Sequence, residues 1–431
     1  MDIITNVSVA AHTLGCKVNQ CDTDAVLAQL TRIGCNIVHG FNMFADVYII
    51  NTCTVTHTAD KKSAQMIRRA RKTNPNAIVA VCGCMTKNNA TTTNALGADY
   101  IFDARSPSDF INFIGATFPA HPPTPHPGGI TTRTRSFVKV QDGCDRFCTY
   151  CIVPYVRGKP VSRSVADIVA EVSTLLEMGV QEIVLTGIQV ACYGQDTDNI
   201  TFAGLIKQVL NLNNLKRLRL SSLDPCAITD DFLHVVASNP RLCDHFHLSL
   251  QSGCNTTLAA MNRRYTAEQY AKVAKSLLEI RPNAAITTDI IVGFPGETDE
   301  HFEQSFEFAK KIGFADIHVF EYSKRAGTPA ATFDGQIADM VKSERGKRMR
   351  ALAASLQTRF YSMQVGKTAN VLFETPKDAD TARGHTSNYC PIEVVNINGN
   401  KCLANTIQSI EITGYTNGGL VGKAADAACA P

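Results

Sequence analysis

Short apolar runs alternate with helical patterns from the start of the chain to about residue 115. The apolar runs are VSVAA, DVYII, AIVAV and ADYIF, and helical patterns lie near 22–34, near 60–72 and after Pro107. Strands that alternate with helices form parallel sheets covered on both faces. The pattern therefore predicts a doubly wound α/β domain over residues 1–118. The proline-rich stretch PAHPPTPHPGG indicates a linker over 119–134.

A second series of strands and helices follows over residues 135–364. Its strand candidates are SFVKVQ, EIVLT, LKRLRLS, HFHLSLQ, AITTDIIVGF and ADIHVFEYS, and each but the last precedes a helical pattern. Six such units predict an incomplete barrel of the TIM type, with its ligand contacts at the C-terminal ends of the strands. A long helical stretch near 336–364 completes this domain.

The pattern changes again over residues 365–424. The runs TANVLFET, PIEVVNI, KCLANTI and SIEITGY are short and are separated by Gly, Asn and Asp. Short alternating strands with turn residues between them predict a small antiparallel β-barrel.

Composition narrows the setting in which this chain works. It is 45% hydrophobic and 19% charged, which is typical of a soluble globular protein, and its net charge of +3 does not identify a partner. No apolar run is long enough to span a membrane, and the N-terminus lacks the features of a signal peptide. We therefore expect a cytoplasmic protein, in which the 16 cysteines stay reduced and some of them hold metal.

Three cysteines lie within eight residues in CDRFCTYC, at Cys144, Cys148 and Cys151. A structural zinc site needs four N or S ligands, and the flanking histidines, His126 and His234, are distant in sequence. Three buried loop cysteines are the plain alternative, which the charged residues of this loop disfavour. The CxxxCxxC spacing after the first strand of a six-unit barrel resembles the radical S-adenosylmethionine (SAM) enzymes. That resemblance implies a [4Fe-4S] cluster whose open iron is chelated by SAM.

Three further cysteines occupy matching places in the first domain: Cys16 in TLGCKVNQ, Cys53 in INTC and Cys84 in CGC. Each follows a predicted strand, and the C-terminal ends of neighbouring parallel strands face one crevice. Any one of them alone is more simply a buried core cysteine. Their repeated placement favours a second three-thiolate cluster. Cys82 is the alternative third ligand. We prefer Cys84, because Gly83 allows the chain to turn just before it.

The three domains together resemble the methylthiotransferase family, from about Ser8 to Gly422. LGCKVNQ and ARGHTSNYCPIEVV are similar to members that act on N6-threonylcarbamoyladenosine in tRNA, and the last domain resembles the RNA-binding TRAM module. The resemblance implies that the cluster on Cys144, Cys148 and Cys151 cleaves SAM to a 5′-deoxyadenosyl radical, which removes hydrogen from C2 of the adenine. It implies that the other cluster supplies sulfur, which a second SAM methylates.

The resemblance also implies which strand-end residues contact SAM, although Gly and Ser there are also ordinary turn residues. They are Thr186, Gly187, Ser222, Asp224, Gln251 and Asp289. The sequence departs from the family in Asp224, where Glu is usual, and in Cys21, where Tyr is usual.

Two groups of residues are candidates for RNA contact. Cations follow Cys53 on a predicted helix, where they either bind phosphate or form a solvated face: Lys61, Lys62, Arg68, Arg69 and Arg71. Residues 365–431 hold five Lys/Arg against six Asp/Glu, so the RNA role of that domain rests on the resemblance. Within it, Arg383 and His385 are RNA candidates or polar turn residues.

We therefore expect a monomeric tRNA methylthiotransferase that carries two [4Fe-4S] clusters, uses SAM and receives electrons from a protein of flavodoxin or ferredoxin type. One alternative is the same chemistry on isopentenyladenosine in tRNA or on a ribosomal protein. Another is a non-catalytic iron–sulfur protein that binds RNA. That protein would bind tRNA but release no 5′-deoxyadenosine from SAM.

Overall fold

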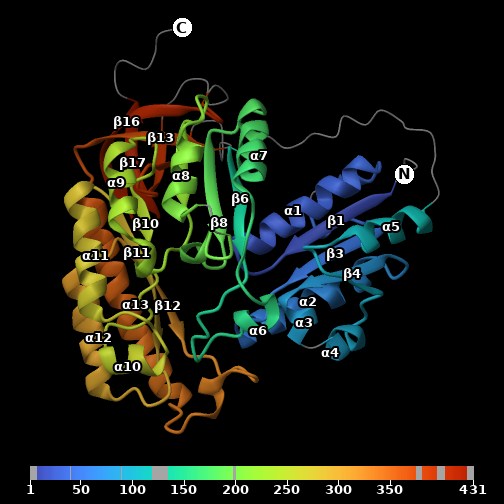
Figure 1. Cartoon of the computed structure of the whole chain (residues 1–431), viewed down its shortest axis with the longest axis horizontal. Helices are drawn as coiled ribbons and strands as arrows, with labels where there is room; N and C mark the ends of the chain where they lie inside the picture. The colour runs from blue at the N-terminus through green and yellow to red at the C-terminus, as the bar shows by residue number, and fades with distance from the viewer. Residues whose placement is uncertain are drawn as a thin grey trace. The chain divides into compact units, whose positions relative to one another are not determined.

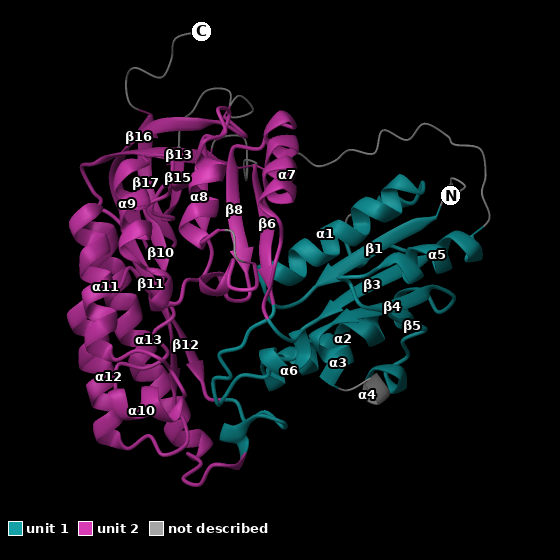
Figure 2. Cartoon of the chain, in the orientation of Figure 1, with its two compact units in different colours: residues 1–131, 143–159, 323–331 teal, residues 132–142, 160–322, 332–431 magenta. Residues whose placement is uncertain are grey.

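The computed structural model describes residues 7–38, 40–88, 90–118, 134–197, 200–374, 381–395 and 403–424 (Figure 1). It forms two compact units, which Figure 2 colours separately. Unit 1 comprises residues 1–131, 143–159 and 323–331, and unit 2 comprises residues 132–142, 160–322 and 332–431. The linker expected over 119–134 lies outside the described residues except for its last residue. None of the described helices has the length and the apolar run needed to cross a membrane.

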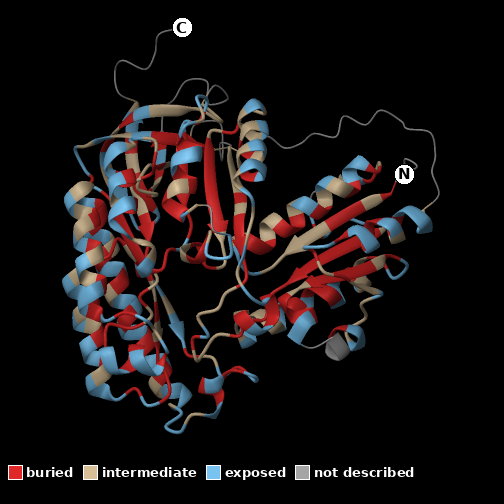
Figure 3. Ribbon diagram, viewed as in Figure 1, coloured by how far each residue is buried: buried red, intermediate tan, exposed pale blue. Residues whose placement is uncertain are grey.

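Unit 1 is built on a parallel sheet with the strand order β2-β1-β3-β4-β5. Its strands are β1 (Ser8–Thr13), β2 (Asn36–Val38), β3 (Val47–Thr52), β4 (Ile78–Gly83) and β5 (Tyr100–Ile101). The central strand β3 is buried along its whole length, as Figure 3 shows. From β1 the chain builds the sheet first toward β2 and then, through β3, in the opposite direction. In such sheets ligands bind outside the C-terminal strand ends where the order reverses, here between β1 and β3.

Helices cover both faces of this sheet, which confirms the doubly wound architecture. They are α1 (Lys17–Arg32), α2 (His57–Thr73), α3 (Cys84–Asn88), α4 (Ala90–Ala95) and α5 (Ser108–Thr117), and the short α6 (Val153–Arg157) belongs to the same unit. Leu30 of α1 and Phe110 of α5 lie in one apolar core, whereas Ile67 of α2 and Met85 of α3 lie in another. Because β-branched and apolar residues fill β3 and β4, both faces of the sheet can pack against helices.

Unit 2 contains six parallel strands, as the sequence predicts. They are β6 (Arg135–Asp142), β8 (Glu182–Gly187), β9 (Arg217–Leu220), β10 (His245–His247), β11 (Ala285–Val292) and β12 (Asp316–Glu321). A short antiparallel β7 (Val161–Ser162) pairs with β6, and parallel bridges such as Leu218–Leu242 connect the β9 region with that of β10. The six strands therefore form the incomplete barrel expected of a radical SAM fold.

The helices of unit 2 are α7 (Val165–Glu177), α8 (Phe202–Leu210), α9 (Asp230–Ser238), α10 (Asn255–Ala260), α11 (Ala267–Ile280), α12 (Asp299–Ile312) and α13 (Asp339–Ser362). The 3₁₀ turns among the described residues are η1 (Val190–Cys192), η2 (Pro225–Ala227) and η3 (Pro329–Thr332). Thr266 begins α11 with a capping box: its side chain accepts from the backbone of Gln269, whose side chain accepts in return.

The two faces of the barrel strands differ in polarity. Phe246, Ile290 and Ile317 point into the main core that the outer helices cover. Side chains alternate across a strand, so His247, Asp289 and His318 lie on the opposite face, which is the inner one. The inside of this half-barrel is therefore polar at the middle of β10, β11 and β12.

The C-terminal residues form a closed five-stranded barrel in the order β13-β14-β15-β17-β16. Its strands are β13 (Thr368–Phe373), β14 (Thr381–Thr386), β15 (Pro391–Val395), β16 (Ile407–Thr416) and β17 (Gly419–Ala424). Its pairs are antiparallel except for β15 with β17. The prediction of a strand over 401–407 is wrong for residues 403–406, which form a turn and a short loop. Residues 401–402 lie outside the described part of the chain.

A buried ion cluster attaches the small barrel to the first residues of three barrel strands. Glu182 of β8 is inaccessible to solvent, and Arg135 of β6, Arg217 of β9 and Arg219 of β9 lie 2.6, 3.0 and 2.8 Å from its carboxylate. Arg217 and Arg219 also donate to backbone carbonyls at the end of β14 and just after it. The small barrel thus packs at the N-terminal ends of the strands and leaves their C-terminal ends, where the site is expected, uncovered by this contact.

Candidate metal centre

The first cysteine triad lies at the C-terminal edge of the unit 1 sheet. Cys16 follows β1 and is the N-cap of α1, Cys53 follows β3, and Cys84 begins α3 directly after β4. Gly15 adopts φ +100°, and a Cβ there would lie 3.0 Å from Cys53 Cβ. Gly83 adopts φ +93°, and a Cβ there would lie 2.4 Å from the carbonyl oxygen of Thr52. Both turns therefore require glycine, and they bring the three strand ends together.

Electrostatics also place these three thiols in one neighbourhood. Burial is the largest of the effects that raise the pKa of Cys53 to about 11, and the nearby thiols of Cys84 and Cys16 contribute to the same shift. Cys53 is therefore protonated at neutral pH until a metal displaces the proton. Cys82 differs, because it is fully buried within β4 in the apolar core. The geometry thus supports Cys84 over Cys82 as the third member.

The second triad lies in segment 143–159, which the contacts assign to unit 1. Cys148 is buried, and Cys144 and Cys151 are half-buried. The backbone N–H of Cys151 donates to the carbonyl of Cys148 at 2.9 Å, and the N–H of Arg146 lies 3.5 Å from Cys144 Sγ. Burial raises the pKa of the Cys144 thiol, to which the neighbouring Cys148 contributes. These three thiols therefore share a tight loop.

Contacts within unit 1 join the two triad regions. Ile152 and Val156, just past the second triad, form an apolar cluster with Cys84. Arg157, at the end of α6, is buried and its guanidinium binds the side chains of Asn19 and Asp22 on α1. The loop of the second triad is thus held against the sheet that carries the first.

The spacing of the sulfurs argues against a single metal ion at either triad. Among the described residues, neither triad brings three ligand atoms within 4.8 Å of one another. A tetrahedral zinc ion with Zn–S bonds of about 2.3 Å would hold its sulfurs about 3.8 Å apart. Three thiolates that each bind a different iron are spaced more widely, so the donor set fits an iron–sulfur cluster better than zinc.

The expected SAM contacts lie near the C-terminal ends of the unit 2 strands, apart from Asp289. Thr186 and Gly187 end β8, and Ser222 follows β9, beside Ser221, whose buried hydroxyl has no hydrogen-bond partner among the described residues. Asp224 is buried, lies 3.2 Å from the Arg263 guanidinium and accepts from Gln189 at 3.4 Å. Gln251 adopts φ +71° after β10.

Asp289 lies in the middle of β11 and is held between two imidazoles. His247 Nε2 and His318 Nδ1 each lie 3.2 Å from its carboxylate. Burial alone would raise the pKa of Asp289, but the two histidines outweigh burial and lower it. Its carboxylate is therefore ionised at neutral pH and engaged with the protein.

The candidate RNA residues differ in how free their charges are. Lys61, Lys62, Arg68 and Arg69 are exposed on α2. Arg71 instead binds the Asp99 carboxylate and the carbonyls of Pro75, Ala77 and Gly97. In the small barrel, Arg383 pairs with Glu393, and His385 lies 3.1 Å from Glu374 and stacks on Tyr389. Four of the five candidate cations of α2 are therefore exposed to solvent, and Arg71 is engaged with the protein.

A pocket of about 420 Å³ lies next to these cations. Its lining includes Lys61 and Arg68 together with Thr54 and Met85, which directly follow Cys53 and Cys84. Unit 1 therefore places positive charge and an opening beside two members of the first triad.

Sequence reasoning missed several residues that shape these sites. Arg325 donates to Asp60 and to Thr54 at 2.6 Å each, which attaches segment 323–331 to α2. Such a pairing across 265 positions leaves no local signal. His247 and His318 do leave one, because polar residues alternate with apolar ones in HFHLSLQ and DIHVFE.

Comparisons with known proteins agree with this arrangement. Residues 138–309 match the Radical SAM superfamily, and residues 8–102 match the Uncharacterized protein family UPF0004. The chain is 36% identical to threonylcarbamoyladenosine tRNA methylthiotransferase MtaB of Bacillus subtilis, covering 89% of this chain and 90% of that protein. It is 33% identical to tRNA-2-methylthio-N(6)-dimethylallyladenosine synthase of Clostridium tetani, covering 93% of each chain.

Solved structures support the fold. The radical SAM methyltransferase TsrM of Kitasatospora setae, solved with cobalamin and a [4Fe-4S] cluster bound, superposes with a TM-score of 0.58 at 13% identity, covering 76% of this chain and 77% of that one. The cobalamin-dependent radical SAM enzyme OxsB gives a TM-score of 0.52 at 12% identity, covering 81% and 55%. At these identities the likeness concerns the fold.

Proposed function

The chain belongs to the family of radical SAM tRNA methylthiotransferases, and we propose that it attaches a methylthio group to C2 of N6-threonylcarbamoyladenosine next to the tRNA anticodon. The observation that carries the proposal is the pair of cysteine triads in unit 1, one at the sheet's switch point and one after β6. Relatives named for threonylcarbamoyladenosine, at up to 36% identity, support this nucleoside.

The two triads have separate tasks in this proposal. When bound, a [4Fe-4S] cluster on Cys144, Cys148 and Cys151 supplies the electron that cleaves SAM, and a second cluster on Cys16, Cys53 and Cys84 holds the sulfur to be transferred. The polypeptide positions the reactants and excludes water. Asp224, with Arg263 and Gln189 beside it, offers a carboxylate at the C-terminal end of β9, where a barrel places ligand contacts.

The proposed partners follow from the charges. The exposed cations of α2 bind tRNA phosphates, and the pocket beside Lys61 and Arg68 is of a size for one base turned out of its stack. The TRAM-like barrel adds contacts through Arg383 and His385. An electron donor of flavodoxin or ferredoxin type reduces the cluster. Because tRNA is the substrate, we place the reaction in the cytoplasm. We also propose that the enzyme is a monomer.

A direct comparison of substrates tests the proposal. Anaerobically reconstituted protein is incubated with SAM, a reductant and tRNA that carries either threonylcarbamoyladenosine or dimethylallyladenosine, and the nucleosides are analysed by mass spectrometry. We expect the methylthio derivative of threonylcarbamoyladenosine. Modification of only the dimethylallyl nucleoside would instead support the activity named for the Clostridium tetani relative. Release of no 5′-deoxyadenosine with either tRNA would support the non-catalytic alternative.

A further inference from the structure

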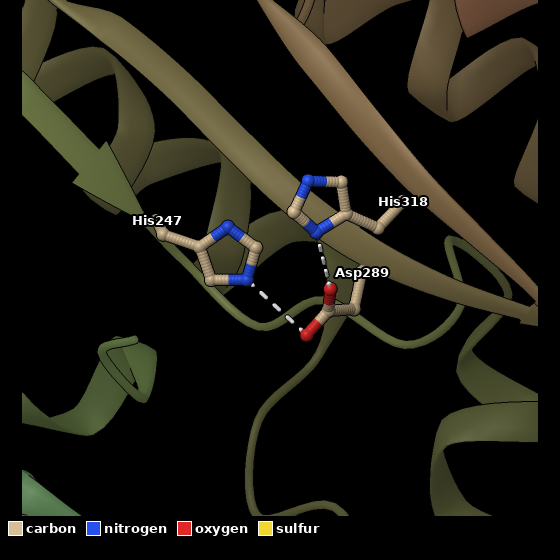
Figure 4. Close-up of side chains that lie close together, drawn as sticks. All are labelled: His247, Asp289 and His318. Carbon is tan, nitrogen blue, oxygen red and sulfur yellow. Dashed lines mark hydrogen bonds and ion pairs between the residues drawn. The ribbon is translucent and has the colours of Figure 1, made fainter. Parts of the chain in front are cut away.

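Figure 4 shows three side chains on the inner face of the half-barrel that converge on one point: His247 from β10, Asp289 from β11 and His318 from β12. Their ligand atoms lie within 4.8 Å of one another, and no other such trio of His, Cys, Asp or Glu occurs in the described part of the chain. We propose that they bind one divalent transition-metal ion of the zinc class, separate from both iron–sulfur clusters.

The distances within the trio suit coordination. Asp289 Oδ2 lies 3.2 Å from His247 Nε2, and Asp289 Oδ1 lies 3.2 Å from His318 Nδ1. Two ligands bonded to one zinc ion at about 2.1 Å lie about 3.2–3.4 Å apart when the angle between them is near tetrahedral. A small rotation of the imidazoles would therefore allow an ion to replace the protons that now join these atoms.

Metal-binding histidines nearly always hydrogen-bond through their second ring nitrogen, and each of these histidines has a polar atom near that nitrogen. His247 Nδ1 lies 2.9 Å from Thr287 Oγ1, so its N–H can donate there while Nε2 faces the ion. Asp316 Oδ2 lies 3.6 Å from His318 Nε2. The Thr287 hydroxyl therefore orients the His247 ring before any metal arrives, and the Asp316 carboxylate lies at ion-pair distance from the His318 ring.

Charge favours a cation over an anion at this point. The carboxylates of Asp289 and Asp316 bring negative charge to the group, which a divalent ion neutralises. Two imidazoles and one carboxylate with open positions are a ligand set of catalytic zinc and of non-haem iron.

Solvent can reach the trio, so an entry path exists. The side chains of His318, Asp289 and His247 are 55%, 24% and 10% exposed. Strand register supports the geometry, because Asp289 and His318 are direct partners on neighbouring strands. The open positions of the ion would face the interior of the half-barrel and can take water or an anionic oxygen of a bound molecule.

The test measures zinc in the intact enzyme. Protein with its clusters reconstituted is equilibrated with Zn²⁺ and desalted, and zinc and iron are measured by mass spectrometry. We expect about one zinc per chain beyond the clusters in wild type. His318→Ala and His247→Ala should lose it, whereas His234→Ala, an exposed histidine of α9, should retain it.

A milder variant separates coordination from folding. Thr287→Val keeps the size of the side chain but removes the acceptor behind His247, so zinc affinity should fall about 10- to 100-fold. Competition with a chelator gives the affinity, and circular dichroism checks that each variant is folded. Failure of folded wild type to retain zinc, or equal retention by folded His318→Ala, would overturn the proposal and leave a histidine pair hydrogen-bonded through Asp289.

Discussion

The Glu182 cluster offers the sharpest test of how the small barrel is attached. Burial alone would raise the pKa of Glu182, but Arg219, Arg217 and Arg135 outweigh it and hold the pKa far below its usual range. The side chains of these arginines are only 2%, 7% and 13% exposed. Glu182→Gln keeps the shape but leaves the buried Arg217 and Arg219 without this counter-charge, whereas Arg135 keeps Glu374 at 3.3 Å. Loss of one partner from a buried ion pair costs about 3–5 kcal/mol, and we expect that range here.

Urea denaturation followed by circular dichroism measures this loss. The matched control is Glu393→Gln, which breaks an exposed pair with Arg383 and should cost less than about 1 kcal/mol. Glu182 contributes fully above its unfolded pKa, near 4.3, and its contribution is lost as the pH falls below that value. The difference in the free energy of unfolding between wild type and Glu182→Gln should therefore shrink by about 1.4 kcal/mol per pH unit below about pH 4. A loss at pH 7 no larger than that of the control would refute this account of the cluster.

Three further outcomes follow from the structure. Replacing Arg68 and Arg69 by Ala should weaken tRNA binding and reduce the slope of log K against log [salt] by about 1.4–1.8. The control variant on α11, Lys272→Ala with Lys275→Ala, should leave that slope unchanged. Equal slopes for the two variants in filter binding would show that α2 is only a solvated face. Reconstituted protein should hold roughly eight irons, Cys84→Ala roughly four, and Cys82→Ala as many as wild type; iron loss in folded Cys82→Ala would reverse the choice between the two cysteines. Burial raises the pKa of Cys390 to about 12, so iodoacetamide should label this thiol between pH 7 and 9 only after the protein unfolds. Mass spectrometry of the peptide measures the labelling, and rapid labelling of the native protein would contradict this expectation.

The sequence predicts the sheets of this protein better than its small barrel. Buried apolar runs mark β3 and β4 clearly, and the parallel topology then places Cys16, Cys53 and Cys84 at one edge. Strand β14 was missed because TARGHT is polar and contains Gly384. A Cβ at Gly384 would lie 2.3 Å from the carbonyl of Leu372, a requirement that only the folded barrel reveals.

Side-chain partners were the least predictable part of the site. Nothing near Arg71 in sequence indicates that its guanidinium donates to the Gly97 carbonyl and pairs with the Asp99 carboxylate. The alternation in DIHVFE does place His318 on the inner face of β12, but its meeting with Asp289 depends on the register between β11 and β12. Register is set by packing of whole strands, so a local pattern does not supply it.

The division of work between the two triads is tested most directly by measuring both products in one reaction. The triple variant Cys16→Ala, Cys53→Ala, Cys84→Ala leaves Cys144, Cys148 and Cys151 in place. The variant Cys148→Ala instead removes one ligand of the second triad and leaves the whole first triad in place. With SAM, reductant and threonylcarbamoylated tRNA, we expect the folded triple variant to release 5′-deoxyadenosine but to form no methylthio nucleoside, and Cys148→Ala to form neither. Since metal binding supports folding, circular dichroism and tRNA affinity are checked first. Methylthio-modified adenosine from the folded triple variant would contradict the account, because Cys16, Cys53 and Cys84 would then be ordinary core cysteines.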